Sequence, residues 1–146
     1  MAHQRLATIG YEQASQGAVI ERLKAAGIEV LIDVRAVAAS RRAGFSKTIL
    51  ANSLAEHGID YVHLRALGTP KAGREAARAG RIGEMHEIYL KHLEEPAAQL
   101  ELAKAGEIAQ ARAAALLCYE AEATRCHREI VAERLAAAHG FEILDL

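Results

Sequence analysis

The sequence of 146 residues has no tryptophan, two phenylalanines and four tyrosines, so it offers few flat side chains on which the bases of a single-stranded nucleic acid could stack. Its two cysteines, Cys118 and Cys126, are too few for a disulfide framework. No apolar run approaches the roughly 20 residues of a membrane-spanning helix, and no signal-peptide core follows the first residues. We therefore expect a cytoplasmic protein without membrane partners, in which both cysteines remain thiols.

The remaining composition is that of a globular protein, with 51% hydrophobic and 25% charged residues. A chain of this length typically forms one domain, so we expect a single domain over residues 1–146. The net charge of −1 conceals an asymmetry, because residues 35–81 carry nine Lys/Arg and three Asp/Glu, whereas residues 82–146 carry six and twelve. The basic segment 35–81 is suited to bind phosphate or nucleic acid, or it forms a solvated surface without a partner.

Short apolar runs alternate with helical patterns along the chain. Five runs are predicted to be strands, at residues 6–9, 28–34, 59–64, 113–118 and 141–146. Helical patterns occupy residues 19–24, 46–57, 82–94, 96–111 and 129–138, and we expect the last of them to begin near Thr124. The alternation predicts an α/β fold, with a mostly parallel sheet between helices on both faces. For the sheet we expect the strand order 3-2-1-4-5.

Polar and reactive side chains follow the carboxyl ends of the predicted strands. In a parallel sheet these ends meet at one edge, which is where ligands bind. The sequence therefore predicts a site at this edge that handles a small anionic molecule. Its candidate catalytic residues are Cys118, Glu120, Cys126 and His127, and its candidate ligand-binding residues are Gly10, Tyr11, Arg35, Arg41, His63 and Arg128.

Cys126 is the strongest candidate for a reactive group. We expect it in the first turn of the last helix, where free backbone N–H groups and the helix dipole stabilise a thiolate. Arg125 and Arg128 add positive charge, and His127 could serve as an acid or a base. Cys126 is therefore predicted to react faster than Cys118. The alternative is that Cys126 is a small buried residue that packs the helix onto the sheet.

The segment that follows Cys118 suggests a second interpretation. Cys118 ends a strand and is separated by six residues from Arg125, which resembles the active loop of rhodaneses and cysteine phosphatases. The stretch 31–35 (LIDVR) likewise resembles the second-strand signature of rhodaneses. Such loops hold an anion with accessible backbone N–H groups, which calls for glycine and other small residues. Residues 119–124 contain two glutamates and no glycine, so they predict a poor cradle for an oxyanion.

A metal site is a further alternative, because thiolates and imidazole are ligands of zinc and iron. Cys118, Cys126 and His127 would supply these ligands, with Glu120 as a candidate fourth. Their spacing matches no standard zinc motif. Adjacent residues of a helix point about 100° apart, so Cys126 and His127 are expected to meet one ion only with difficulty. The sequence identifies no cofactor.

Arginines recur beside the predicted site. Arg35 follows a buried strand, and Arg41 lies in the next loop. Such residues make bidentate contacts with phosphate or carboxylate. They also form ion pairs inside a fold, for example between Arg35 or Arg128 and Asp33 or Glu120. Both interpretations remain open from the sequence.

Several short motifs occur in the order typical of one family. They are Thr8-Ile9-Gly10, Asp33-Val34-Arg35, Ser40-Arg41, Phe45-Ser46, Gly58-Ile59 with Tyr61 and His63, Leu67-Gly68, Leu117-Cys118 with Glu120, and Cys126-His127-Arg128. Through them the chain resembles domain-of-unknown-function family 488 over residues 6–139. The resemblance implies a Rossmann-like α/β domain of bacterial or archaeal origin, and it implies no reaction. Two residues depart from the family pattern, Glu12 at a position that is usually a small hydroxyl residue and Ala38 at one that is usually proline.

Two main classes of function therefore remain. The first is an enzyme whose Cys/His/Arg/Glu pocket acts on a small anionic ligand. The second is a non-catalytic module that holds nucleic acid or a protein through the basic segment 35–81, and metal binding through the cysteines is a further possibility. The scarcity of aromatic residues favours the first class. The sequence gives no indication of the oligomeric state.

Overall fold

A computed structural model describes residues 5–146 of the chain. In the described part of the chain five strands form one sheet with every pair parallel. They are β1 (Arg5–Gly10), β2 (Val30–Asp33), β3 (Asp60–His63), β4 (Ala114–Cys118) and β5 (Glu142–Asp145). The expected α/β fold of Rossmann-like type is confirmed. None of the described helices is both long and apolar enough to span a membrane.

The order of the strands is β3-β2-β4-β1-β5, so the expected order 3-2-1-4-5 is wrong. β4 lies between β1 and β2, and its Leu116 pairs with Thr8 on one side and Ile32 on the other. The physical reason is burial. All five residues of β4 are buried and uncharged, which suits a central strand, whereas β1 begins with the exposed Arg5 and every residue of β5 is exposed. The exchange places the end of β4 directly beside the end of β2, while β4 remains next to β1.

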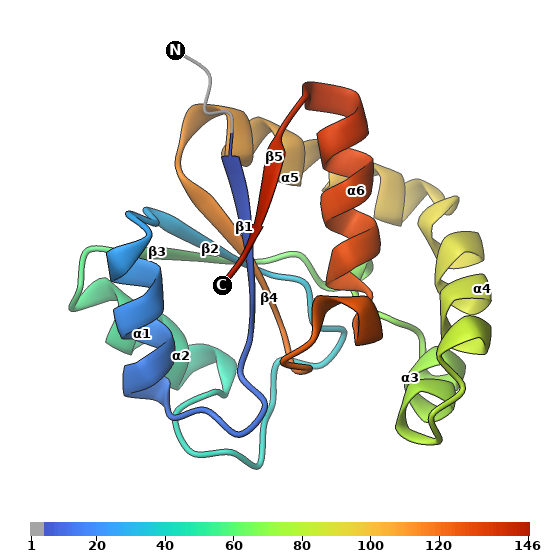
Figure 1. Ribbon diagram of the computed structural model, residues 1–146, viewed down its shortest axis with the longest axis horizontal. Helices are drawn as coiled ribbons and strands as arrows, with labels where there is room; N and C mark the ends of the chain where they lie inside the picture. Colours follow the sequence, from blue (N-terminus) through green and yellow to red (C-terminus); the bar gives the residue numbers. More distant parts are fainter. Residues whose placement is uncertain (1–4) are drawn as a thin grey trace.

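Helices cover both faces of the sheet, which confirms the expected layers (Figure 1). α1 (Gln16–Ala25) and α2 (Lys47–Ala55) pack on one face, and α4 (Ile82–Leu93), α5 (Pro96–Ala111) and α6 (Arg128–His139) pack on the other. Alternating residues of a strand face opposite sides, so Leu6 joins the core under α4, α5 and α6 while Ala7 and Ile9 join the core under α1 and α2.

The segment between β4 and α6 differs from its prediction. A short 3₁₀ turn, η2 (Ala123–Arg125), is followed by Cys126 in an extended conformation with φ −129° and ψ 146°. His127 is the N-cap, and α6 begins only at Arg128. The expected helix start near Thr124 is therefore wrong, and Cys126 precedes the first helical turn instead of lying in it. The segment after β3 contains η1 (Arg65–Leu67) and α3 (Lys71–Arg78).

Candidate active site

A cavity of about 610 Å³ lies at the carboxyl edge of the sheet and is lined by the loops that follow β1, β2, β3 and β4. The loop after β1 leads to α1 on one face of the sheet, and the loop after the neighbouring β4 leads to α6 on the other face. The two loops therefore diverge at the carboxyl ends of these strands. The described lining includes seven of the ten predicted site residues, and Gly10, His63 and Arg128 lie outside it. The prediction of a site at this edge therefore agrees with the position of the cavity.

Two thiols and an imidazole meet in the wall of this cavity. Cys118, Cys126 and His127 are 5%, 1% and 6% exposed. Nδ1 of His127 lies 3.5 Å from Sγ of Cys118 and 3.7 Å from Sγ of Cys126. Nε2 lies 2.6 Å from the carbonyl oxygen of Val34, which is an acceptor, so Nε2 carries a proton. This hydrogen bond, together with the ring of Tyr89 at 5.0 Å between centroids, fixes the imidazole with Nδ1 near the thiols.

The expectation that Cys126 and His127 would meet one ion only with difficulty is wrong, because it assumed a helical Cys126. In the described part of the chain these two residues and Cys118 form the one group whose three ligand atoms, all within 4.8 Å of one another, suit a metal such as zinc. Sγ of Cys118 is 3.5 Å from Nδ1 and 4.0 Å from Nε2. A sulfur almost equidistant from both ring nitrogens lies alongside the ring, so Cys118 would have to move to share an ion with Nδ1.

The surroundings distinguish the two thiols. Burial raises the pKa of the Cys126 thiol. This effect is outweighed by hydrogen bonds from the Cys118 thiol, from His127 and from the backbone N–H of Arg128, and by the charge of His127. The pKa of Cys126 is therefore well below its ordinary value. Burial and the neighbouring Cys126 raise the pKa of Cys118 well above its ordinary value. Burial lowers the pKa of His127, whereas the thiolate of Cys126 and the carbonyl of Val34 raise it, and the net direction is upward. The favoured arrangement is a Cys126 thiolate beside a His127 imidazolium, with Cys118 as a neutral thiol.

Glu120 is a titratable group at the same wall. Its Oε2 lies 3.9 Å from Sγ of Cys118. Burial and the charge of Cys126 raise the pKa of the Glu120 carboxyl to about 7. Glu120 is therefore able to give or take a proton near neutral pH.

We expect Glu120→Gln to stabilise the protein more at pH 8 than at pH 5. The pKa of Glu120 in the folded state is about 7, and the unfolded value is about 4.3, so the folded state binds the proton more tightly. The wild-type protein therefore loses stability as the pH rises from the unfolded to the folded pKa, whereas glutamine does not titrate. Thermal unfolding of both proteins across this range measures the difference. A difference that does not change with pH would contradict the raised pKa.

Gly10 lies behind the cavity and determines the path of the loop after β4. A Cβ at this position would be 1.7 Å from the carbonyl oxygen of Glu120, so a side chain would force the loop to move. Glu12 holds the same loop, because its carboxylate accepts a hydrogen bond of 3.1 Å from the backbone N–H of Ala121. Glu12, one of the two residues that depart from the family pattern, thus has a structural role.

Gly10→Ala should lower the free energy of unfolding by about 1–3 kcal/mol through this overpacking. Gly17→Ala is the matched control, because Gly17 lies in α1 and a Cβ there meets no atom within 4 Å. The control should be neutral or stabilise the protein by up to about 1 kcal/mol. Urea denaturation of the two variants measures both effects. Similar free energies for both would show that the loop does not need a glycine beneath it.

Two predicted ligand-binding residues occupy positioning roles in the structure. Arg128 is fully buried, and its guanidinium donates to the carbonyl groups of Glu120 and Ala121. Its partners are thus backbone carbonyls and not the carboxylates considered from the sequence. Nε2 of His63 lies 2.7 Å from the carbonyl oxygen of Arg35. Both residues hold the loops that form the cavity.

The sequence left two roles open for Arg35, ligand binding and an internal ion pair, and in the structure Arg35 forms the ion pair. Its Nη2 lies 2.7 Å from a carboxylate oxygen of Asp33, and the two side chains are 5% and 0% exposed. Arg35 also donates to the hydroxyl of Tyr11 at 3.1 Å and to the carbonyl of Phe45 at 2.8 Å, while the hydroxyl of Tyr61 donates to Asp33. The charge of Arg35 is therefore neutralised inside the fold, although the residue borders the cavity.

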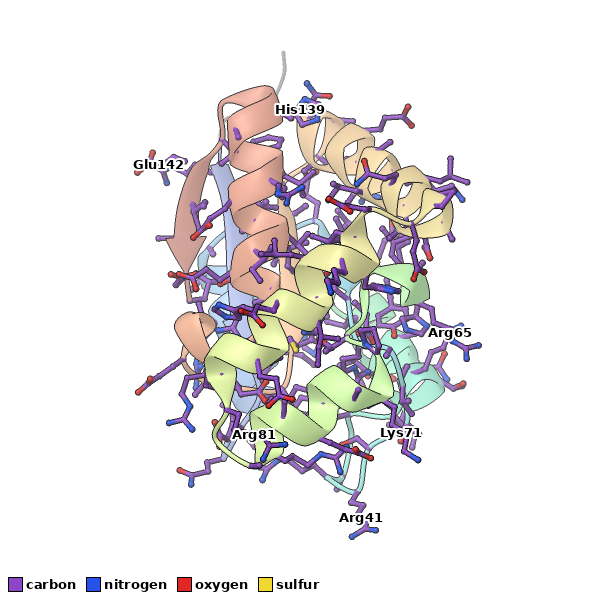
Figure 2. All side chains as sticks on the ribbon, turned by 90° about the vertical axis from the view of Figure 1, so that its right-hand side faces the viewer. Arg41, Arg65, Lys71, Arg81, His139 and Glu142 are labelled. Carbon is purple, nitrogen blue, oxygen red and sulfur yellow. The ribbon has the colours of Figure 1, made fainter. Side chains whose placement is uncertain are left out.

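Other arginines bring positive charge to the cavity. Arg41, Arg74, Arg78 and Arg125 all line it. Sequence reasoning did not single out Arg78, and the signal that would have found it is its spacing of four residues from Arg74, which places both on one face of α3. In Figure 2 the labelled residues Arg41, Lys71 and Arg81 of the basic segment lie in the lower part of the molecule, whereas Arg65 lies higher at the right-hand side and Glu142 near the upper end.

Comparison with known families matches residues 15–135 to the family described as Domain of unknown function DUF488. The match includes both thiols, His127 and all the arginines that line the cavity. No curated protein and no solved structure shows a match.

Proposed function

The chain belongs to the DUF488 family, and we propose that it is an enzyme that acts on a small anionic molecule through the thiolate of Cys126. The observation that carries this proposal is the position of the Cys126 sulfur, next to His127 and in the wall of an arginine-lined cavity. The cavity, of about 610 Å³, falls within the range of about 300–1,000 Å³ that is common for small-molecule sites.

Each polar group of the cavity has a role in such an enzyme. Cys126 is the nucleophile, and His127 stabilises its negative charge while Val34 holds the imidazole in place. Glu120 protonates the leaving group, since its pKa is about 7. Arg41, Arg78 and Arg125, which form no ion pair with the described residues, attract the anionic part of the substrate.

The alternatives have less support. Nucleic-acid binding through residues 35–81 needs cations arrayed along an open surface, whereas several arginines of this segment surround one cavity and Arg35 is already paired. Metal binding needs Cys118 to move, because its sulfur lies alongside the ring of His127 and not in front of Nδ1. A steep loss of nucleic-acid binding with salt would support the first alternative, and chelator-dependent thiol reactivity would support the second.

Two alkylating agents that differ in charge test the proposal. Relative to a free thiol, Cys126 should favour the anionic iodoacetate over the neutral iodoacetamide by about tenfold, because the arginines attract the carboxylate. Arg78→Ala should reduce this preference several-fold. Lys71→Ala, on the same helix but outside the lining, should leave it unchanged. Peptide mass spectrometry gives the rates at Cys126, and an absent preference, or an equal loss in the two variants, would contradict an anionic substrate.

A further inference from the structure

We propose that Cys118 and Cys126 act as a dithiol that reduces small anionic disulfides, with Cys126 as the attacking thiolate and Cys118 as the resolving thiol. The inference rests on the function proposed for Cys126. It adds a role for Cys118, the class of bond that is broken and the class of substrate.

The first argument is that a second thiol, that of Cys118, lies in the same cavity as Cys126. One thiolate suffices for acyl or phosphoryl transfer, yet both cysteines line the same cavity, and their sulfur atoms lie within 4.8 Å of each other. A disulfide has an S–S distance of about 2.05 Å, so closure requires the two sulfur atoms to approach by at most about 2.8 Å. Cys126 is the residue suited to move, because it lies in the short extended segment between η2 and α6, whereas Cys118 ends the central strand.

The second argument concerns the bond that is attacked. Transfer of an acyl or phosphoryl group develops an oxyanion, which backbone N–H groups must stabilise. In the loop after β4 three of these groups are already used, because the N–H of Ala121 binds Glu12 and those of Arg125 and Cys126 bind carbonyls of the preceding turn. Thiol–disulfide exchange needs no such cradle, since the negative charge remains on sulfur. The use of these three N–H groups inside the loop therefore favours a disulfide as the substrate.

The reaction balances in two steps. The thiolate of Cys126 attacks one sulfur of R–S–S–R, a mixed disulfide forms, and the second sulfur leaves with the electron pair and takes the proton of Glu120. Cys118 then passes its proton to the Glu120 carboxylate, 3.9 Å away, and attacks Sγ of Cys126, which expels the remaining thiolate RS⁻. The two protein thiols are oxidised to a disulfide, and the substrate is reduced by two electrons. A small external dithiol restores the reduced protein.

The third argument is charge. Arg41, Arg74, Arg78 and Arg125 line the same cavity as the two thiols, with Glu120 as the acidic residue of the described lining. A disulfide that carries carboxylates is therefore attracted, and one that carries ammonium groups is repelled.

Matched disulfide probes test the proposal on the full, reduced protein. Dithiodipropionate carries two carboxylates and cystamine carries two ammonium groups, while both contain the same S–S bond. We expect the wild-type protein to form a Cys118–Cys126 disulfide, at least about tenfold faster with dithiodipropionate than with cystamine. Cys118→Ser should stop at a mixed disulfide on Cys126, and Cys126→Ser should form neither product. Intact and peptide masses identify each product.

The outcomes separate the two proposals. A wild-type protein that accumulates the mixed disulfide as Cys118→Ser does would overturn the resolving role of Cys118 and leave the nucleophile in place. Equal rates with both probes would overturn the anionic class of substrate. A Cys126 that reacts neither with the probes nor with iodoacetamide would overturn the proposed function itself. Cys118→Ala, examined in parallel with thermal unfolding, keeps the test valid if serine disturbs the buried end of β4.

Discussion

His127→Phe should slow the alkylation of Cys126 at pH 7 by about tenfold or more. The variant keeps a ring of similar size but removes the positive charge and the donor beside the sulfur, which lies 3.7 Å from Nδ1. The pKa of Cys126 should then return to its ordinary value or above it, since burial also raises it. An ordinary thiol is ionised to only about a few per cent at pH 7, so most of the reactive form is lost.

His139→Phe is the control for this prediction. His139 is the last residue of α6, lies outside the cavity lining and has its ring 5.7 Å from that of Phe141. Its replacement should leave the alkylation rate of Cys126 within about twofold of the wild-type value, since independent sites contribute nearly additively. An unchanged rate in His127→Phe, or equal losses in the two variants, would show that His127 does not stabilise the thiolate. Iodoacetamide kinetics read at the Cys126 peptide distinguish these results.

Arg35→Met should lower the free energy of unfolding by about 3–5 kcal/mol, because it leaves a buried carboxylate without its cation. Asp33 is 0% exposed, and Arg35 is its ion-pair partner at 2.7 Å. The exposed pair between Arg112 and Asp60 is the matched control, with side chains that are 39% and 67% exposed. Arg112→Met should cost no more than about 1 kcal/mol.

Urea denaturation of both arginine variants and of Asp33→Asn/Arg35→Met measures these differences. The double variant should recover part of the lost stability, because it no longer buries an unpaired charge. If Arg35→Met unfolds at the same urea concentration as Arg112→Met, then Asp33 reaches water or another cation. The ion pair would then not support the loop after β2.

Strands and layers of this fold could be predicted because they follow from local patterns. The run IEVLIDV at residues 28–34 is nearly all apolar, which indicates a strand buried on both faces, and β2 is fully buried. The place of β4 beside β2 could not be read in the same way. Strand order depends on which strands occupy the centre of the sheet. β4, all of whose residues are buried, takes the place between β2 and β1, although β1 comes earlier in the chain.

The candidate site was predictable for a related reason. The carboxyl ends of parallel strands meet, so Cys118, Arg35 and Tyr11 were expected at one edge and all three line the cavity. The conformation of Cys126 was not predictable, because a single extended residue between a 3₁₀ turn and a helix leaves no periodic signal. The close approach at Gly10 was also hidden, since it depends on the path of a loop more than a hundred residues later in the chain.

The rate of iodoacetamide labelling at each cysteine against pH, with and without a chelator, tests the central claim most directly. We expect Cys126 to be labelled faster than Cys118, at a rate that falls little as the pH is lowered through neutrality, because its thiol is already ionised there. The chelator should change neither rate. Slow labelling of both cysteines that a chelator accelerates would indicate a metal held by this cluster. Equal, slow labelling in both conditions would contradict the account and leave Cys118, Cys126 and His127 as a packing contact between β4 and α6.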